Sequence, residues 1–147
     1  MGFGVDQHGK SQDATKAAVR AVRNAIEFNS IPGVISHLPG GRKNMLIHVK
    51  LGVPRLLPSP AGSVVKDELR HVDVWEVAKV FPYGKLLPIE MEVGGLAFPT
   101  GRVVEELGDE DDVGICVAAC VTLGYVDEST GHNGKAQHKT FNTKDGY

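Results

Sequence analysis

The run from Val113 to Val126 constrains the fold more than any other part of the sequence. It reads VGICVAACVTLGYV, so apolar side chains occupy both alternating faces and no charged residue interrupts them. A half-exposed strand alternates apolar with polar residues, whereas a strand that is buried on both faces does not. The run therefore predicts a central strand that is covered on both sides, around which the rest of a sheet is arranged.

Two helices are predicted on the N-terminal side of this strand. Apolar residues recur at helical spacing after Asp13, a typical capping residue, and predict a helix that runs to about Asn29. The apolar stripe consists of Ala14, Ala18, Ala21, Val22, Ala25, Ile26 and Phe28. A second, short helix is predicted from Asp73 to Phe81, because the residues from Asp73 to Glu76 have the form of a capping box.

Two further segments have the character of strands. Met45 to Val53 (MLIHVKLGV) alternates with period two and places its odd-numbered residues on one apolar face. Lys85 to Val93 is also predicted as a strand, and Pro88 within it indicates an edge position or a bulge. The acidic segment from Val103 to Asp112 predicts a helical turn.

These elements predict one α/β (α+β) sandwich domain over residues 1–126, with two helices on one face of a mixed sheet. The polar segment 127–147 is expected to be a flexible tail. The second sheet face still carries apolar residues, and self-association is the simplest way to cover it. We therefore expect a homo-oligomer, a trimer or a dimer, with sites at subunit edges.

Composition excludes several classes of partner. The net charge of -2 and the pI near 6.3 argue against a nucleic-acid binder, which usually carries a basic stripe. No stretch has the length and apolarity of a membrane span. Cys116 and Cys120 lie about 13 Å apart along one strand, too far for a disulfide, and lack zinc-type spacing. We expect reduced thiols and a cytoplasmic protein.

The glycine-rich N-terminus matches a nucleotide-binding pattern. Residues Gly4 to Ser11 (GVDQHGKS) fit the P-loop pattern G-x-x-x-x-G-K-[ST], whose backbone N–H groups and lysine hold phosphates. A P-loop follows a buried strand and begins its helix at the lysine, whereas only Met1 to Phe3 precede this run and Asp13 is the natural cap. Nucleotide binding is therefore the weaker alternative.

The same run contains the pattern G-x-G-x-D-x-H-G, formed by Gly2, Gly4, Asp6, His8 and Gly9. The chain continues with DATKAAVR at residues 13–20, HVKLGVP at 48–54, FPYGK at 81–85 and GGL at 94–96. Together these segments resemble an uncharacterised family of conserved hypothetical proteins found in bacteria, plants and fungi. The resemblance covers about residues 1–126 and implies a site at the N-terminal motif without naming a reaction.

The order of elements also resembles the trimeric folds of monofunctional bacterial chorismate mutase and of the amidohydrolases that open the rings of cyanuric acid and barbiturate. This resemblance implies a trimer. The amidohydrolases use a Ser–Lys pair, for which Lys50 could supply the lysine, but the turn at Gly94-Gly95 offers no serine. A shared fold does not fix a shared reaction.

Asp6 and His8 are the main candidates for catalysis. Residues two apart on an extended segment point to the same face, about 6.5–7 Å apart at the backbone, and the flanking Gly4 and Gly9 let a ligand approach closely. Asp6 could orient His8 as a general acid or base. Alternatively both could ligate a divalent metal, with a third ligand drawn from Glu90, Glu92 and His48. In the structural alternative, Asp6 caps the turn and His8 bonds to backbone.

A second group of candidates lies on the two middle strands. Lys50 shares a strand face with His48, and this face could simply be exposed to solvent. Alternatively, Lys50 could supply a positive charge or a base of lowered pKa. Glu90 and Glu92 likewise could face solvent or act as acid–base partners of Lys50. Gly94 and Gly95 could form an anion-binding turn or a strand-ending bulge. Arg102 could clamp a carboxylate or remain a surface residue.

The leading hypothesis is a small-molecule enzyme with a polar site at a subunit interface, which carries out proton transfer or hydrolysis on a carbonyl-bearing compound. Asp6 and His8 would be its acid–base or metal-binding pair, and Lys50 the electrostatic partner. The alternatives are a non-catalytic ligand-binding or scaffold oligomer and a P-loop-like nucleotide binder.

Overall fold

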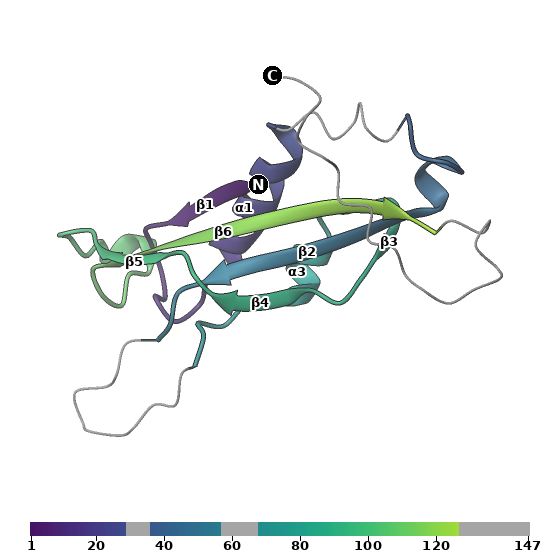
Figure 1. Cartoon of the computed structure of the whole chain (residues 1–147). Coiled ribbons are helices and arrows are strands. Elements are labelled where there is room, and N and C mark those ends of the chain that lie inside the picture. The colour runs from purple at the N-terminus through teal and green to yellow at the C-terminus, as the bar shows by residue number, and fades with distance from the viewer. Residues whose placement is uncertain (29–35, 57–67, 127–147) are drawn as a thin grey trace, which may run out of the picture.

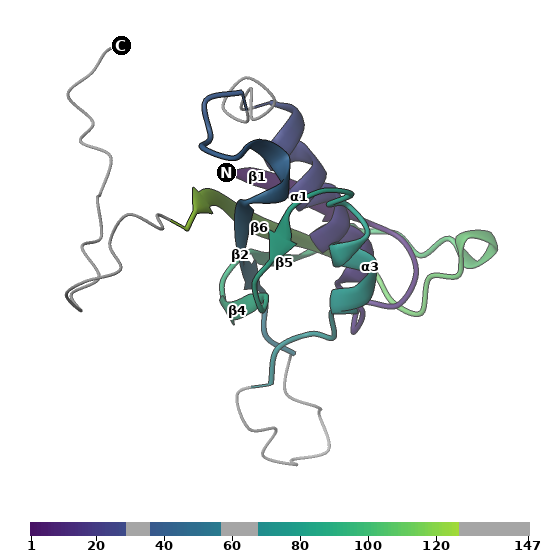
Figure 2. The ribbon, with the colours of Figure 1, turned by 90° about the vertical axis from the view of Figure 1, so that its right-hand side faces the viewer.

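The structure is a computed structural model that describes residues 1–28, 36–56 and 68–126, so the predicted tail at 127–147 lies outside the described residues. A mixed sheet of six strands carries two helices on one face (Figure 1, Figure 2), which confirms the predicted α+β class. The elements are β1 (Gly2–Asp6), α1 (Thr15–Glu27), η1 (Gly41–Lys43), β2 (Met45–Val53), α3 (Val74–Ala78), β3 (Lys85–Leu86), β4 (Glu90–Val93), β5 (Leu96–Pro99), η2 (Glu105–Leu107) and β6 (Val113–Tyr125).

Strand β6 is the centre of the sheet, as its apolar sequence predicts (Figure 1). It pairs antiparallel with β1 along one edge. Along the other edge it pairs with β2 over residues 118–125 and with β5 over residues 113–116. One long strand therefore acts as the template for three shorter ones, and the position of each of these is fixed by its register on β6.

The outer edge of β2 carries two short parallel strands, β3 and β4. The prediction of one continuous strand from Lys85 to Val93 is wrong, because the segment leaves the sheet between Leu86 and Glu90. Leu87 N still donates to Ile47 O at 2.8 Å, but Pro88 has no N–H to continue the ladder. The predicted effect of Pro88 is thus confirmed as an interruption at the sheet edge.

Helix α1 lies directly on β1 because Gly2 and Gly4 have no side chains. A Cβ atom at Gly4 would stand 2.1 Å from Ala17 O, and one at Gly2 would stand 2.3 Å from Ala21 O. The helix side of this contact includes five buried residues of the predicted stripe, which are Ala14, Ala18, Ala21, Val22 and Ala25. Ala17, which the predicted stripe did not include, is buried beside them. Strand and helix backbones therefore touch, which only small residues permit.

The ends of α1 differ from the prediction. The helix begins at Thr15 with Ala14 as its N-cap, while the Asp13 carboxylate accepts a hydrogen bond from Thr15 N at 2.9 Å. Phe28, predicted on the buried stripe, is 78% exposed. The first residue of β1, Gly2, lies against Ala25 of the helix. The strand therefore does not reach Phe28, which comes three residues later in the helix, and cannot cover it.

Helix α3 has the predicted cap but is shorter than predicted. The Asp73 carboxylate accepts hydrogen bonds from Trp75 N at 2.9 Å and Glu76 N at 3.4 Å. The helix ends at Ala78, because Val80 and Phe81 turn back through shorter i to i−3 hydrogen bonds before Pro82.

Neither helix in the described ranges is long and apolar enough to cross a membrane.

The second face of the sheet, here called the open face, carries no covering element among residues 1–28, 36–56 and 68–126 (Figure 2). Phe3 and Leu96 on this face are 61% and 65% exposed, and Val5 is 39% exposed. Val5 and Leu96 are the two cross-strand partners of Cys116 on β6, and Phe3 pairs with Ala118 of the same strand. A single chain therefore covers β6 on the helix side only, and the predicted cover of the second face would have to come from another chain.

The contact between α1 and β1 makes a mutational prediction. Gly4→Ala should lower the free energy of unfolding by about 2–3 kcal/mol, because the helix has to move away from the new methyl group. Urea denaturation measures this change. Gly124→Ala on β6 is the matched control, since its Cβ atom meets nothing within 4 Å, and it should change stability by less than about 0.5 kcal/mol. Equal midpoints for the two variants would contradict the proposed packing.

Candidate functional site

Asp6 ends β1 and faces the helix side of the sheet. Its carboxylate forms an ion pair with Arg20 of α1, with Nη1 to Oδ1 at 3.3 Å, and its side chain is 12% exposed. The same Arg20 nitrogen donates a hydrogen bond to Val5 O. Asp6 is therefore held by the helix, and its ion pair with Arg20 occupies the carboxylate that the sequence assigned to orienting the imidazole of His8.

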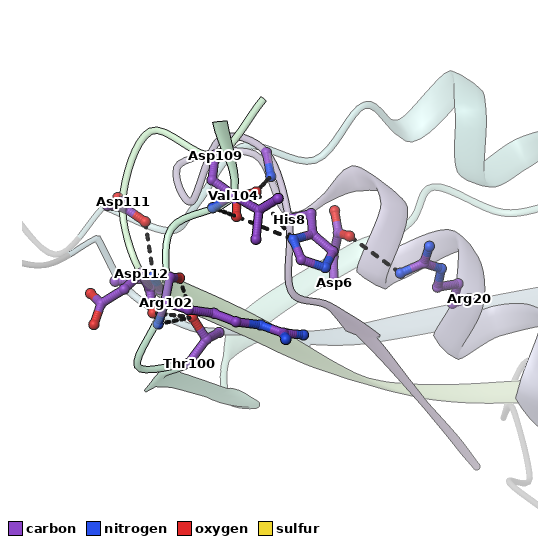
Figure 3. A network of polar contacts seen from close by, with 11 residues as sticks. Asp6, His8, Arg20, Thr100, Arg102, Val104, Asp109, Asp111 and Asp112 are labelled. Atoms are coloured by element: carbon purple, nitrogen blue, oxygen red, sulfur yellow. Dashed lines mark hydrogen bonds and ion pairs between the residues drawn. The ribbon is translucent and has the colours of Figure 1, made fainter. Parts of the chain in front are cut away.

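His8 is instead held by Asp109, which the sequence analysis missed (Figure 3). His8 Nδ1 lies 3.2 Å from both carboxylate oxygens of Asp109. The same carboxylate accepts hydrogen bonds from Gly9 N and Val104 N, each at 2.8 Å. The Asp109 side chain is 1% exposed and that of His8 is 32% exposed. The buried Asp109 carboxylate thus holds the Nδ1 edge of an imidazole ring that is partly accessible to solvent.

Local backbone geometry places Asp109 at this position. The predicted acidic turn contains the 3-10 helix η2, whose C-cap is Gly108 with a φ of 78°. Glycine adopts this conformation at little cost. Gly9 has a φ of 95° and turns its N–H toward the carboxylate. The N–H groups of Gly9 and Val104 stabilise the charged form and lower the pKa of the Asp109 carboxyl.

This arrangement suits His8 for proton transfer. A carboxylate that accepts from Nδ1–H fixes the tautomer in which Nε2 is unprotonated and can take up a proton. The negative charge of Asp109 also stabilises the imidazolium ion that forms when it does so. The signal that could have identified Asp109 is its place directly after Gly108 in the acidic segment 105–112.

Arg102 is the second candidate residue near this position. Figure 3 shows its side chain extending from the 100–104 loop toward the part of the chain that carries Asp6 and His8. Its backbone is fixed, because Arg102 O accepts from Thr100 Oγ1 at 2.9 Å, and the same hydroxyl contacts Asp112 O at 3.0 Å. Within the described part of the chain the guanidinium group has no ion pair, so its charge is available to an anion.

Lys50 and its neighbours form a separate cluster on the open face. Lys50 Nζ lies 2.7 Å from Glu92 and 3.6 Å from Glu90, and His48 Nε2 lies 3.1 Å from Glu90 without hydrogen-bond geometry. The hydrogen bond that Lys50 donates to the Glu92 carboxylate raises the pKa of Lys50. The prediction of a lysine base with a lowered pKa is therefore wrong, because two carboxylates favour its charged form.

The two clusters do not form one site within a chain. Asp6 pairs with Ile115 on β6 and Lys50 pairs with Cys120, five residues along the same strand. That spacing is about 17 Å, and an odd number of residues places the two side chains on opposite faces of the sheet. Asp6 thus lies on the helix side with Arg20, and Lys50 lies on the open face.

The glycine pair beyond β4 is a backbone packing element. Gly95 has a φ of 66°, and a Cβ atom there would stand 2.2 Å from Cys116 O. Gly94 N donates to Val53 O at 3.0 Å, and Gly94 lies against Gly52. These contacts fit the predicted bulge, at which the chain passes from β4, paired with β2, to β5, paired with β6. Gly94 N donates its hydrogen bond within the sheet and is therefore not available to bind an anion.

The N-terminal run does not have the geometry of a P-loop. Gly4 lies within β1, and α1 begins at Thr15, five residues after Lys10. Lys10 pairs with Glu110 at 3.3 Å, and Ser11 Oγ donates to Asp111 at 2.5 Å. The lysine and hydroxyl that would bind phosphate and magnesium thus contact carboxylates of the 109–111 segment.

A metal site at Asp6 and His8 does not fit these contacts. The Asp6 carboxylate is paired with Arg20 and His8 Nδ1 with Asp109. Among residues 1–28, 36–56 and 68–126, no three side chains of His, Cys, Asp or Glu are grouped as a metal ion would need. The predicted third ligands His48, Glu90 and Glu92 belong to the Lys50 cluster.

Comparisons with known proteins place this chain in a family. A crystal structure described as an FtsZ-like protein of unknown function from Nostoc punctiforme PCC 73102 is 35% identical, covers 85% of this chain and 91% of its own, and has a TM-score of 0.58. No curated protein gives a significant match. A family model described as a conserved hypothetical protein matches residues 1–123. The chain therefore belongs to the Lin0512 family of conserved hypothetical proteins, as the N-terminal motif and the segments that follow it predict.

Proposed function

We propose that this protein is a cytoplasmic small-molecule enzyme that uses His8 as a general acid and base on a carbonyl-bearing carboxylic acid. The observation that carries the proposal is the hydrogen bond between His8 Nδ1 and the buried Asp109 carboxylate, which leaves Nε2 as the reactive nitrogen. Arg102 would bind the carboxylate of the substrate or the oxyanion that develops on its carbonyl oxygen. The chemistry is proton transfer or hydrolysis.

In a proton-transfer reaction, Nε2 would take a proton from the carbon next to the carbonyl group. The electron pair of the broken C–H bond would move to the carbonyl oxygen as an enolate, whose charge Arg102 would offset. Asp109 would stabilise the imidazolium ion, and return of the proton from Nε2 would complete the reaction. In hydrolysis the same nitrogen would take a proton from an attacking water molecule.

The alternative function is a non-catalytic scaffold, and two further contacts between the same segments favour it. The pairs Lys10–Glu110 and Ser11–Asp111 join the same two segments as His8 and Asp109. If His8 merely adds to this junction, its loss should affect stability and nothing else. A stability measurement together with a chemical measurement therefore distinguishes the two roles of His8.

The lowered pKa of Asp109 makes a prediction about pH. The unfolded chain binds this proton more readily than the folded protein, so the stabilisation is complete above the ordinary pKa of 3.8 and is lost as the pH falls through the lower folded value. We expect Asp109→Asn to be less stable than its parent above about pH 5, and the difference to shrink toward about pH 2. Urea midpoints would be compared in a His8→Gln background, which removes the imidazole from the comparison. A difference that does not change with pH would contradict this account.

The acid–base role predicts exchange of carbon-bound protons. In D2O the protein should catalyse deuterium incorporation next to the carbonyl group of at least one member of a panel of 2-oxo acids, which NMR detects. His8→Gln should lower that rate by about 10²–10⁴-fold, and Arg102→Gln should mainly weaken binding. Lys50→Gln is the matched control, because it removes a charge from the open face. Exchange that persists in a folded His8→Gln protein would refute the role of His8.

We further propose that the protein is a homo-oligomer, a trimer in the leading version, that covers the open face. The exposed Phe3 and Leu96 support this, since apolar residues grouped on one face often mark an interface. Light scattering should give a multiple of the 15.7 kDa chain mass. Phe3→Glu should shift the protein toward monomer, while Phe28→Glu, a change of equal charge at an exposed helix end, should not. A monomeric wild-type protein would exclude the oligomer.

A further inference from the structure

The two helices are too short to cover the whole helix side of the sheet. Strand β6 has 13 residues and spans about 44 Å, whereas α1 also has 13 residues but is only about 20 Å long. Helix α3 ends at Ala78. Beyond the helices, the segment from Val80 to Tyr83 and the β6 residues Val121 and Leu123 line the same unfilled space.

A cavity of about 230 Å³ lies at this end of the sheet. Its floor is formed by Met45 and Ile47 of β2 with Val121 and Leu123 of β6, and Phe81 contributes to its wall. An apolar cavity of about 150 Å³ binds benzene in another protein. This cavity therefore has room for an aromatic ring with a short chain, or for an aliphatic chain of similar volume.

The same cavity has one cationic residue in its lining. The Arg42 guanidinium carbon lies 4.9 Å from the centre of the Tyr83 ring, and both residues line the cavity. A guanidinium group that stacks on an aromatic ring by its face keeps its N–H groups for hydrogen bonds to an anion. Within the described ranges Arg42 has no ion pair, so an anion would meet an uncompensated positive charge.

We propose that this cavity binds a small monocarboxylic acid whose apolar ring or chain lies against β2 and β6 and whose carboxylate pairs with Arg42. The site is separate from His8, because Leu123 lies eight residues along β6 from Ile115, the partner of Asp6, which is about 27 Å. An apolar lining with a single cation matches a ligand with one charge at one end. The inference does not depend on the proposed acid–base function.

The first test asks whether the cavity is the binding site. The probe is 3-phenylpropionate, and its binding is measured by NMR titration of the full chain. Val121→Phe places a ring in the cavity, so it should abolish binding while the protein remains as stable as wild type, because the added group occupies existing space. Binding that survives in the folded variant, or no binding to the wild-type protein, would overturn the proposal.

The second test asks whether Arg42 recognises the carboxylate. Arg42→Gln should weaken 3-phenylpropionate binding by about three- to tenfold, the range for a partly exposed ion pair with a charge-assisted hydrogen bond. The neutral analogue 3-phenylpropanamide should bind the wild-type protein and this variant equally. Lys43→Gln, the next residue on η1, removes the same charge without lining the cavity. Equal weakening by Arg42→Gln and Lys43→Gln would show long-range attraction only and would overturn the role of Arg42.

Discussion

The direct contact between the backbones of β1 and α1 fixes the part of the N-terminal motif that lies in the sheet, from Gly2 to Asp6, and the rest of the motif continues from it. Because no Cβ atom separates the two backbones at Gly2 and Gly4, side chains of the helix reach the free edge of the strand. Asn24 Oδ1 accepts from Phe3 N at 3.1 Å, and Arg20 donates to Val5 O. These bonds satisfy groups that an edge strand otherwise exposes to other chains. The following residues then leave the sheet toward the 104–109 turn, where His8 meets Asp109.

The two proposed sites lie at opposite ends of β6 for one geometric reason. A strand rises more than twice as far per residue as a helix, so a helix of equal residue number covers less than half of it. At the end near Ile115 the uncovered space is closed by polar loops that exchange hydrogen bonds with one another. At the end near Leu123 it is closed by Val80 to Tyr83, whose apolar side chains do not fill it. Polar loops provide the chemistry of the first site, and incomplete apolar packing provides the volume of the second.

Local sequence predicts local structure here, and long-range register decides the rest. The bounds of β2, the cap at Asp73 and the central place of β6 follow from periodicity and capping within a few residues. The pairing of His8 with Asp109 joins positions that are 101 residues apart. Neither segment has a repeating sequence pattern from which its contact with the other could be predicted. The separation of Asp6 from Lys50 depends on the register of two strands on β6. The alternation of side chains along β1 does predict one part of this separation. Asp6 lies two residues after Gly4 and therefore points to the helix side, as Gly2 and Gly4 do.

The structural demands of the motif explain all of its residues except one. Gly2 and Gly4 are required by the helix contact, Gly9 by its positive φ, and Asp6 by its ion pair with Arg20. His8 has no comparable demand, because two backbone N–H groups already satisfy the Asp109 carboxylate and other side chains join the same segments. An amide side chain could make the same hydrogen bond to Asp109, but it could not exchange a proton near neutral pH. An imidazole differs from an amide in that it can accept and release a proton, and the acid–base proposal rests on that difference.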